Sequence, residues 1–215
     1  MADCGTPELW EASKLARIGL VYEDEAIRIF LEIMSPQILG VPVELEPLRG
    51  GAWPGIVGDV SDLLQALSVE HITNPLDCVL VVVDANGTGP NYRVQRLKNK
   101  VGNRRFRFGV PIYHSIVRQV ETWLLGDPQA INTAAGRVIP VVHQPELMLD
   151  PKRHLIKVLE NNHARPYGRA FQRAFAQSAD VGAIAAKCPG FQTFVEKLRQ
   201  CLQQGRLFQQ DSIEE

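Results

Sequence analysis

The sequence contains little cysteine, no long apolar run and, across one long segment, no acidic residue. Its cysteines include no C-x-x-C pair, so neither a zinc site nor a disulfide framework is expected, and we expect mostly buried, reduced thiols at Cys4, Cys78, Cys188 and Cys201. No apolar run approaches the ~18 residues of a membrane-spanning helix, and the N-terminus lacks the apolar core of a signal peptide. These absences predict a cytoplasmic protein that does not contact a membrane.

No Asp or Glu occurs between Ala85 and Val120, although the net charge of the whole chain is only -1. The same segment contains a set of cations that we call the basic run: Arg93, Arg96, Lys98, Lys100, Arg104 and Arg105. Such a segment predicts a nucleic-acid-binding face, on which basic side chains set affinity rather than sequence preference. The alternative is a solvated helix and strand surface. A later loop could also approach a phosphate, through His163, Arg165, Tyr167 and Arg169.

The first half of the chain alternates strands and helices. We predict strands at 15–22, 41–48 and 78–83, with helices at 27–38 and 59–67 between them. This order predicts an α/β fold with a mainly parallel sheet, flanked by helices and joined by right-handed crossovers. The six apolar residues at 78–83 leave no polar face, so this strand should lie inside the sheet.

The second half is predicted to be mostly helical. After a basic helix from about Tyr92, we expect a strand between Arg105 and Tyr113 and a helix from about Ser115 to Gly126. Further helices are predicted at 151–161, 167–177, 180–187 and 191–204. With 215 residues, 45% of them hydrophobic, the chain can form one large domain with a helical extension. We divide it into an α/β core at 1–144 that starts with a loose arm, a helical extension packed on the core at 145–207, and a disordered tail at 208–215.

Polar residues follow two of the predicted strands. Glu23 closes the first strand, and Asp84 and Asn86 come directly after the central one. Because ligands bind outside the carboxyl ends of the strands in open α/β sheets, these residues should meet at one edge. A plainer explanation is also open, since Asp, Asn and Gly are common in strand-ending turns and Asp24 is suited to cap the next helix.

Glu121 lies at the edge of the apolar face of the predicted helix at 115–126. A carboxylate held against a core is costly unless a cation meets it, so Glu121 either faces the other acids or pairs with a nearby arginine. Oxygen ligands from several strand ends suit Mg²⁺, and Mn²⁺ is the alternative. We predict that Glu23, Asp84 and Glu121 are catalytic and that they hold the metal together with Asn86.

Three short motifs together resemble the Toprim fold: Val21-Tyr22-Glu23-Asp24, Asp84-Ala85-Asn86, and the Glu-x-Trp-Leu-Leu-x-Asp segment at 121–127. More closely, the chain resembles an uncharacterised bacterial Toprim-like family, related to OLD-type nucleases and found beside ABC-type ATPases in phage-defence loci. The segment Lys187-Cys188-Pro189-Gly190-Phe191 is similar to that family's closing helix. The resemblance implies a nuclease that uses Mg²⁺ or Mn²⁺, with nucleic acid as substrate and an ABC-type ATPase as a partner.

The chain departs from these families at two positions. Toprim nucleases have a second Asp where this chain has Asn86, and the closer family often has Gly where this chain has Asp24. Asn can donate an oxygen to a metal but brings no charge. Three hypotheses therefore stay open: a nuclease, a non-catalytic module that binds nucleic acid or a nucleotide, and a subunit that regulates an ATPase. The sequence also leaves open whether the nucleic acid is DNA or RNA and whether the chain forms a homo-oligomer.

Overall fold

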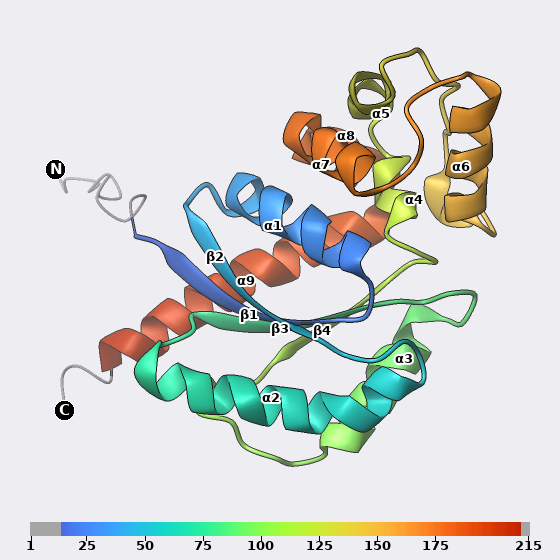
Figure 1. The fold of residues 1–215 in the computed structure, drawn as a ribbon. Coiled ribbons are helices and arrows are strands. Elements are labelled where there is room, and N and C mark those ends of the chain that lie inside the picture. The colour runs from blue at the N-terminus through green and yellow to red at the C-terminus, as the bar shows by residue number, and fades with distance from the viewer. Residues whose placement is uncertain (1–13, 212–215) are drawn as a thin grey trace, which may run out of the picture.

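The structure, a computed structural model, describes residues 14–211 and the side chains of residues 14–205. Its sheet has four parallel strands in the order β2-β1-β3-β4, namely β1 (Ala16–Tyr22), β2 (Val43–Arg49), β3 (Cys78–Asp84) and β4 (Ile112–Ile116) (Figure 1). The predicted α/β fold with a parallel sheet is confirmed. Every residue of β3 is buried, as expected for an interior strand with no polar face.

Helices cover both faces of the sheet. α1 (Glu25–Leu39) and α9 (Pro189–Asp211) lie on one face, and α2 (Gly55–Thr73) and α3 (Pro90–Val101) lie on the other (Figure 1). Because successive side chains of a strand point to opposite faces, Val82 joins the hydrophobic cluster under α1 and α9, whereas Val81 joins the cluster under α2 and α3.

The remaining helices pack on the side of α1. The helices that share its hydrophobic cluster are α4 (Glu121–Leu124), α5 (Pro128–Ala135), α6 (Pro151–Asn161), α7 (Arg169–Ser178) and α8 (Val181–Lys187), and a 3-10 turn, η2 (Pro145–Leu147), contacts α4. α9 itself contacts β3 and β4, so the last helix of the chain belongs to the layer that covers the sheet. The C-terminal third is therefore helical, and it packs directly on the α/β core.

α1 begins and ends at its predicted capping residues. The side chain of Asp24 accepts a hydrogen bond of 2.7 Å from the backbone N–H of Ala26, one of the first N–H groups of the helix. Gly40, with φ of 68°, ends the helix in the left-handed conformation that glycine adopts without steric cost.

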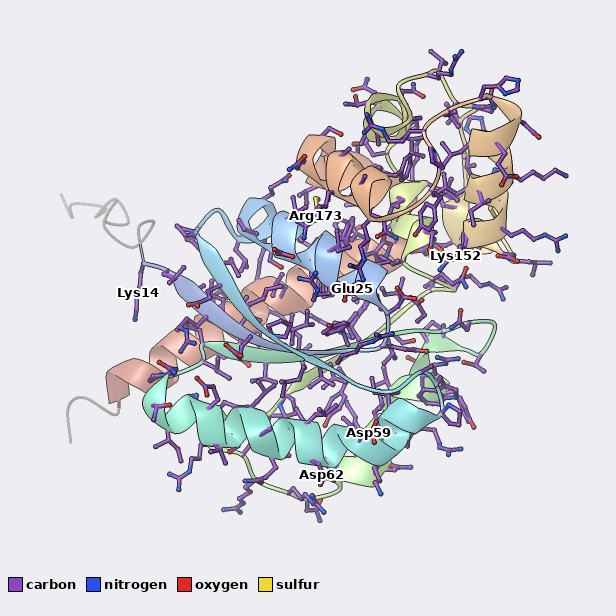
Figure 2. All side chains as sticks on the ribbon, viewed as in Figure 1. Lys14, Glu25, Asp59, Asp62, Lys152 and Arg173 are labelled. Carbon is purple, nitrogen blue, oxygen red and sulfur yellow. A yellow bond between two sulfur atoms is a disulfide. The ribbon has the colours of Figure 1, made fainter. Side chains whose placement is uncertain are left out.

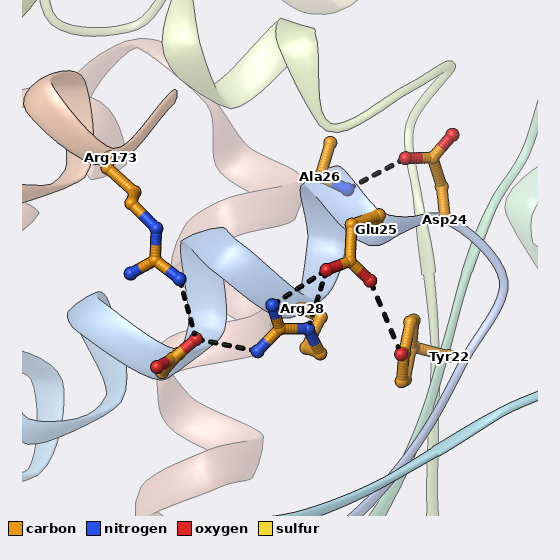
Figure 3. A network of polar contacts seen from close by, with 7 residues as sticks. Tyr22, Asp24, Glu25, Ala26, Arg28 and Arg173 are labelled. Carbon is orange, nitrogen blue, oxygen red and sulfur yellow. Dashed lines mark hydrogen bonds and ion pairs between the residues drawn. The ribbon is translucent and has the colours of Figure 1, made fainter. Parts of the chain in front are cut away.

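A surface network joins α1 to α7. Glu25 turns back along α1 toward Arg28 and accepts a long hydrogen bond from the hydroxyl of Tyr22 (Figure 3). Arg28 and Arg173 of α7 both contact Glu32. Exposed ion pairs of this kind add little stability. They do show that both carboxylate oxygens of Glu25 are engaged, one by Arg28 and the other by Tyr22.

Two secondary-structure predictions are wrong around β4. The strand expected between Arg105 and Tyr113 starts only at Ile112, and residues 102–109 form turns with a single bridge between Phe106 and Gly109. The helix expected from Ser115 begins at Glu121 and lasts four residues. Apolar residues near Ser115 fit either element, and pairing with β3, which sets Asp84 opposite Ile116, makes them a strand.

The prediction of reduced cysteines is wrong for one pair. Cys78 of β3 and Cys201 of α9 form a disulfide, which links the interior strand to the last helix. Cys188 is a free, buried thiol, as predicted, and burial raises its pKa to about 12. Cys4 and the expected arm at 1–13 lie outside the described residues.

α9 continues through Asp211, four residues into the segment expected to be a tail, and residues 212–215 lie outside the described part. α5 was not predicted. Within residues 14–211, no helix has both the length and the apolar character needed to cross a bilayer.

Candidate functional site at the carboxyl edge of the sheet

The winding of the chain reverses between β1 and β3, which are neighbours in the sheet. β1 leads into α1 on one face and β3 leads into α3 on the other, so the loops after these strands diverge at the carboxyl edge. In open α/β sheets, ligands bind at such a switch point. Glu23 and Asp24 lie on the first loop, Asp84 ends β3 itself, and Asn86 lies on the second loop. The structure therefore brings these four residues to one edge.

Asp84 is the acid at this edge with the strongest electrostatic perturbation. Its side chain is buried, and its Oδ1 has no hydrogen-bond partner among the described residues. Burial raises the pKa of Asp84 well above the ordinary value, and the charges of Glu121, Glu23 and Asp24 raise it further, while the backbone N–H of Val120 opposes them. A buried carboxylate that lies among other acids, with one oxygen that has no partner in the described residues, favours the binding of a proton or a cation.

Glu23 is engaged in contacts within the protein. Its Oε2 lies 3.3 Å from Nη1 of Arg93, and both side chains are buried. Its oxygens also accept hydrogen bonds from the backbone N–H groups of Trp53, at 3.0 Å, and Asp84, at 3.4 Å. Arg93 in turn stacks on the Trp53 ring, 4.3 Å from its centroid, and donates to Thr88. Glu23 is thus neutralised by Arg93, and a metal ion would have to compete with that guanidinium.

Except for Arg93, the basic run does not line this edge. Arg93 was predicted to bind nucleic acid, but it is buried in the pair with Glu23. α3 runs away from the acids, because β4 is parallel to β3 and so begins at the opposite edge of the sheet. The twelve residues of α3 span about 18 Å. Lys98 already lies over the ring of Tyr113, near the start of β4. The exposed cations of the basic run are Arg96, Lys98, Lys100, Arg104 and Arg105.

Glu121 is the first residue of α4, and only 2% of it is exposed. Its Oε1 accepts a hydrogen bond of 2.5 Å from the hydroxyl of Tyr167 and lies 3.5 Å from Nζ of Lys152. Its cation is therefore a lysine of α6, in place of the arginine that the sequence suggested, and Figure 2 shows Lys152 where α6 lies beside α4. Gln172 donates to the Tyr167 oxygen at 2.7 Å. Burial and the nearby charge of Glu121 raise the pKa of Tyr167, so its hydroxyl remains a donor.

Two residues at the edge have left-handed backbone conformations. Asn86 has φ of 43° and Arg118 has φ of 66°. The backbone N–H of Asn86 donates to the carbonyl of Arg118 at 2.8 Å, which joins the turn after β3 to the loop after β4. Within residues 14–205, neither side chain makes a hydrogen bond or ion pair. Non-glycine residues in this conformation are uncommon and are concentrated at functional sites.

The oxygen donors at this edge suit a hard cation. No group of three or more His, Cys, Asp or Glu side chains in the described part of the chain is arranged to hold a metal. Mg²⁺ nevertheless often binds through one or two carboxylates together with waters and substrate phosphates, so a complete protein cage is not required. The unpartnered Oδ1 of Asp84 and the nearby charge of Glu121 fit this donor set, and Asn86 can add an uncharged oxygen. Glu23 fits less well because Arg93 already neutralises it.

Sequence reasoning did not identify Trp53, Arg118 or Lys152 as residues of this edge. Arg118 was visible only as one more cation in an acid-free segment, and Lys152 only as a polar residue at the start of a helix. No spacing along the chain connects either residue with Glu121 or Asp84.

Comparison with protein families gives one match. A family model described as "Domain of unknown function (DUF4276)" matches residues 27–199, a range that includes Asp84, Asn86 and Glu121 and begins after Glu23. No match was found among curated proteins or among solved structures. These comparisons show no link to the Toprim fold, so that resemblance rests on the short motifs.

Proposed function

We propose that this chain, which belongs to the DUF4276 family, is a metal-dependent enzyme that hydrolyses phosphodiester bonds in nucleic acid. The observation that carries the proposal is Asp84, a buried carboxylate at the switch point whose Oδ1 has no partner in the described residues. Glu121 and Glu23 add negative charge around it. A divalent cation would relieve this repulsion, and the resemblance of the motifs to Toprim nucleases points to the same chemistry.

The residues divide into ligands and positioning groups. A bound Mg²⁺ or Mn²⁺ would activate a water and offset the charge that develops on the phosphate. Asp84 would bind the metal directly, with Glu121 and Asn86 as further oxygen ligands. Tyr167 orients Glu121 through Oε1, and the other oxygen, Oε2, makes no hydrogen bond within the described residues. Glu23, predicted as a ligand, is better suited to positioning, because it accepts the N–H of Asp84 while Arg93 neutralises it.

A cleavage assay tests this proposal. The full chain is incubated with Mg²⁺ or Mn²⁺ and labelled single-stranded and duplex DNA and RNA. We expect metal-dependent cleavage that is lost in Asp84→Asn and Glu121→Gln, two nearly isosteric changes. Asp62→Asn is the matched control, because Asp62 is an exposed acid of α2 that makes no hydrogen bond or ion pair with the residues that the structure describes (Figure 2). Cleavage by Asp84→Asn at the wild-type rate would show that this edge is not the active site.

A second function, binding without catalysis, is favoured by two observations. Asn86 brings no charge to the site, and Glu23 is already paired with Arg93. A module of this kind would bind a nucleic acid or a nucleotide but leave it intact. Asn86→Asp separates the two functions, because the added charge should raise both metal affinity and cleavage rate in a nuclease. In a binding module it would change affinity alone.

A third role, as a subunit that regulates an ABC-type ATPase in a phage-defence or abortive-infection complex, is supported by the family resemblance of the motifs alone. It does not conflict with either chemistry. Co-purification of the two proteins from a common operon would test it.

A further inference from the structure

We propose that the phosphates of the nucleic acid are bound by Arg118, Lys152 and Arg169, which we call the site cations, rather than by the basic run. The inference rests on the proposed function for the identity of the polyanion. It assigns the binding surface to the loop after β4 and to the helices α6 and α7, and so makes the C-terminal third of the chain part of the site.

The site cations come from three elements, and Glu121 contacts both Lys152 and Tyr167, which lies two residues before Arg169. Lys152 contacts Glu121, yet 41% of its side chain is exposed, so the ammonium group can also face a ligand in solvent. Arg169 is exposed at the start of α7, two residues after Tyr167, and makes no ion pair or hydrogen bond in the described part of the chain. Its charge adds to that of Arg28, the main cause, in lowering the pKa of Glu25, which indicates that Arg169 lies on the side of the first turn of α1.

Arg118 approaches the acids from the loop after β4. Its side chain is half-buried, and a Cβ built on Gly87 would lie 3.8 Å from its Nη1, so the guanidinium lies against the turn after β3. Within residues 14–205 this guanidinium makes no ion pair or hydrogen bond. A half-buried cation that has no partner in the described part of the chain, next to a turn that carries Asn86, is available to an anionic ligand.

The surroundings of the site cations are also positive. Between residues 151 and 173 the sequence has one acid, Glu160. The basic residues of the same segment are Lys152, Arg153, Lys157, Arg165, Arg169 and Arg173. This segment includes α6, the loop that carries Tyr167 and the first turn of α7. Figure 1 shows α6 and α3 on opposite sides of the carboxyl edge. A polyanion can therefore be drawn to the α6 side of the edge although the edge itself is acidic.

The geometry of α3 argues against the basic run. Phosphates of one strand follow each other every ~3.4 Å along a duplex axis, so the ~18 Å length of α3 corresponds to about five nucleotides. Lys100 is at the end of α3, and Arg104 and Arg105 lie beyond it. These cations therefore lie toward the opposite edge of the sheet from Asp84, away from the phosphates that flank a bond cut there.

The test compares two triple variants that remove the same charge. One combines Arg118→Gln, Lys152→Gln and Arg169→Gln, and the other combines Lys100→Gln, Arg104→Gln and Arg105→Gln. Binding is measured in full-length Asp84→Asn protein, by fluorescence anisotropy of 20-nucleotide single strands of DNA and of RNA across a salt titration. Each lost phosphate contact should lower the salt slope of log Kobs by about 0.7 for a single strand, so loss of the site cations should lower it by about 2. We expect little change in the basic-run variant.

A double variant, Arg118→Gln with Arg169→Gln, keeps the ion pair between Lys152 and the buried Glu121, so it retains this contact of the fold. The salt slope of log Kobs should fall by about 1.4 in this variant. The inference is overturned if the slope falls in the basic-run variant and not in the site-cation variants, or falls in neither. Cleavage is scored separately in protein with Asp84 intact. Absence of cleavage with the expected slopes would remove the nuclease proposal and leave the binding surface in place.

Discussion

Replacing Arg93 by Met tests whether Glu23 positions Asp84 or binds a ligand itself. Methionine keeps much of the apolar volume of the arginine and removes its charge. Glu23 would then stay buried with its two backbone hydrogen bonds and without its guanidinium partner. Removing one partner of a buried pair costs about 3–5 kcal/mol, because the other charge is left uncompensated. For a chain of this size each kcal/mol lowers Tm by about 2–4 °C, so Tm should fall by about 6–20 °C.

Urea unfolding at pH 7, followed by circular dichroism, measures this loss without relying on the fluorescence of Trp53, which contacts Arg93. Adding Glu23→Gln to Arg93→Met should recover most of the stability, because a neutral amide no longer requires a cation. The double-mutant cycle then gives the coupling free energy of the pair. Arg96→Met is the matched control on α3, since Arg96 is exposed and, among the described side chains, its guanidinium hydrogen-bonds and stacks only with Tyr92. Its effect should stay within about 0.5 kcal/mol.

A loss below about 1 kcal/mol in Arg93→Met, or no recovery in the double variant, would refute this reasoning. Glu23 would then be solvated or free to reorient, and its original assignment as a direct metal ligand would return.

Three further predictions follow from single contacts. Because the pKa of Asp84 is raised in the folded state, the protein loses stability as pH rises from about 4 toward the folded pKa. Without metal, the Asp84→Asn variant should therefore have a higher Tm than wild type at pH 7, and this difference in Tm should vanish near pH 3.5. The disulfide between Cys78 and Cys201 spans 123 positions, for which the loop-entropy estimate is about 5 kcal/mol; Cys201→Ser should lose about this much in urea unfolding, and reduced wild type should match it. Tyr167→Phe removes a donor to a buried carboxylate and should cost about 1.5–3 kcal/mol, with a higher metal requirement for any cleavage.

Features that depend on neighbours along the chain could be predicted from the sequence. Asp24 and Gly40 marked the ends of α1 because capping involves residues within one turn. The apolar run at 78–83 predicted an interior strand because burial on both faces leaves no polar position. β4 was misplaced because its short apolar pattern also fits a helix, and only pairing with β3 decides between them.

Contacts between distant residues could not be predicted in the same way. The sequence placed acids at the strand ends, but it did not say which of many cations each acid would meet. Packing decides those pairings, and they join residues separated by 70, 46 and 123 positions: Glu23 with Arg93, Glu121 with Tyr167, and Cys78 with Cys201. For the same reason the basic run looked like the binding face, although the direction of α3 takes most of it away from the acids.

The central claim is that Asp84 is the centre of a divalent-cation site. It is tested most directly by thermal unfolding of wild type and Asp84→Asn across a titration with Mn²⁺ and with Mg²⁺. An ion at a hundredfold excess over its Kd stabilises the folded state by about 2.7 kcal/mol. Wild-type Tm should therefore rise by about 5–11 °C, and the Tm of Asp84→Asn should not change. No rise in wild type with either ion, or an equal rise in Asp84→Asn, would contradict the claim.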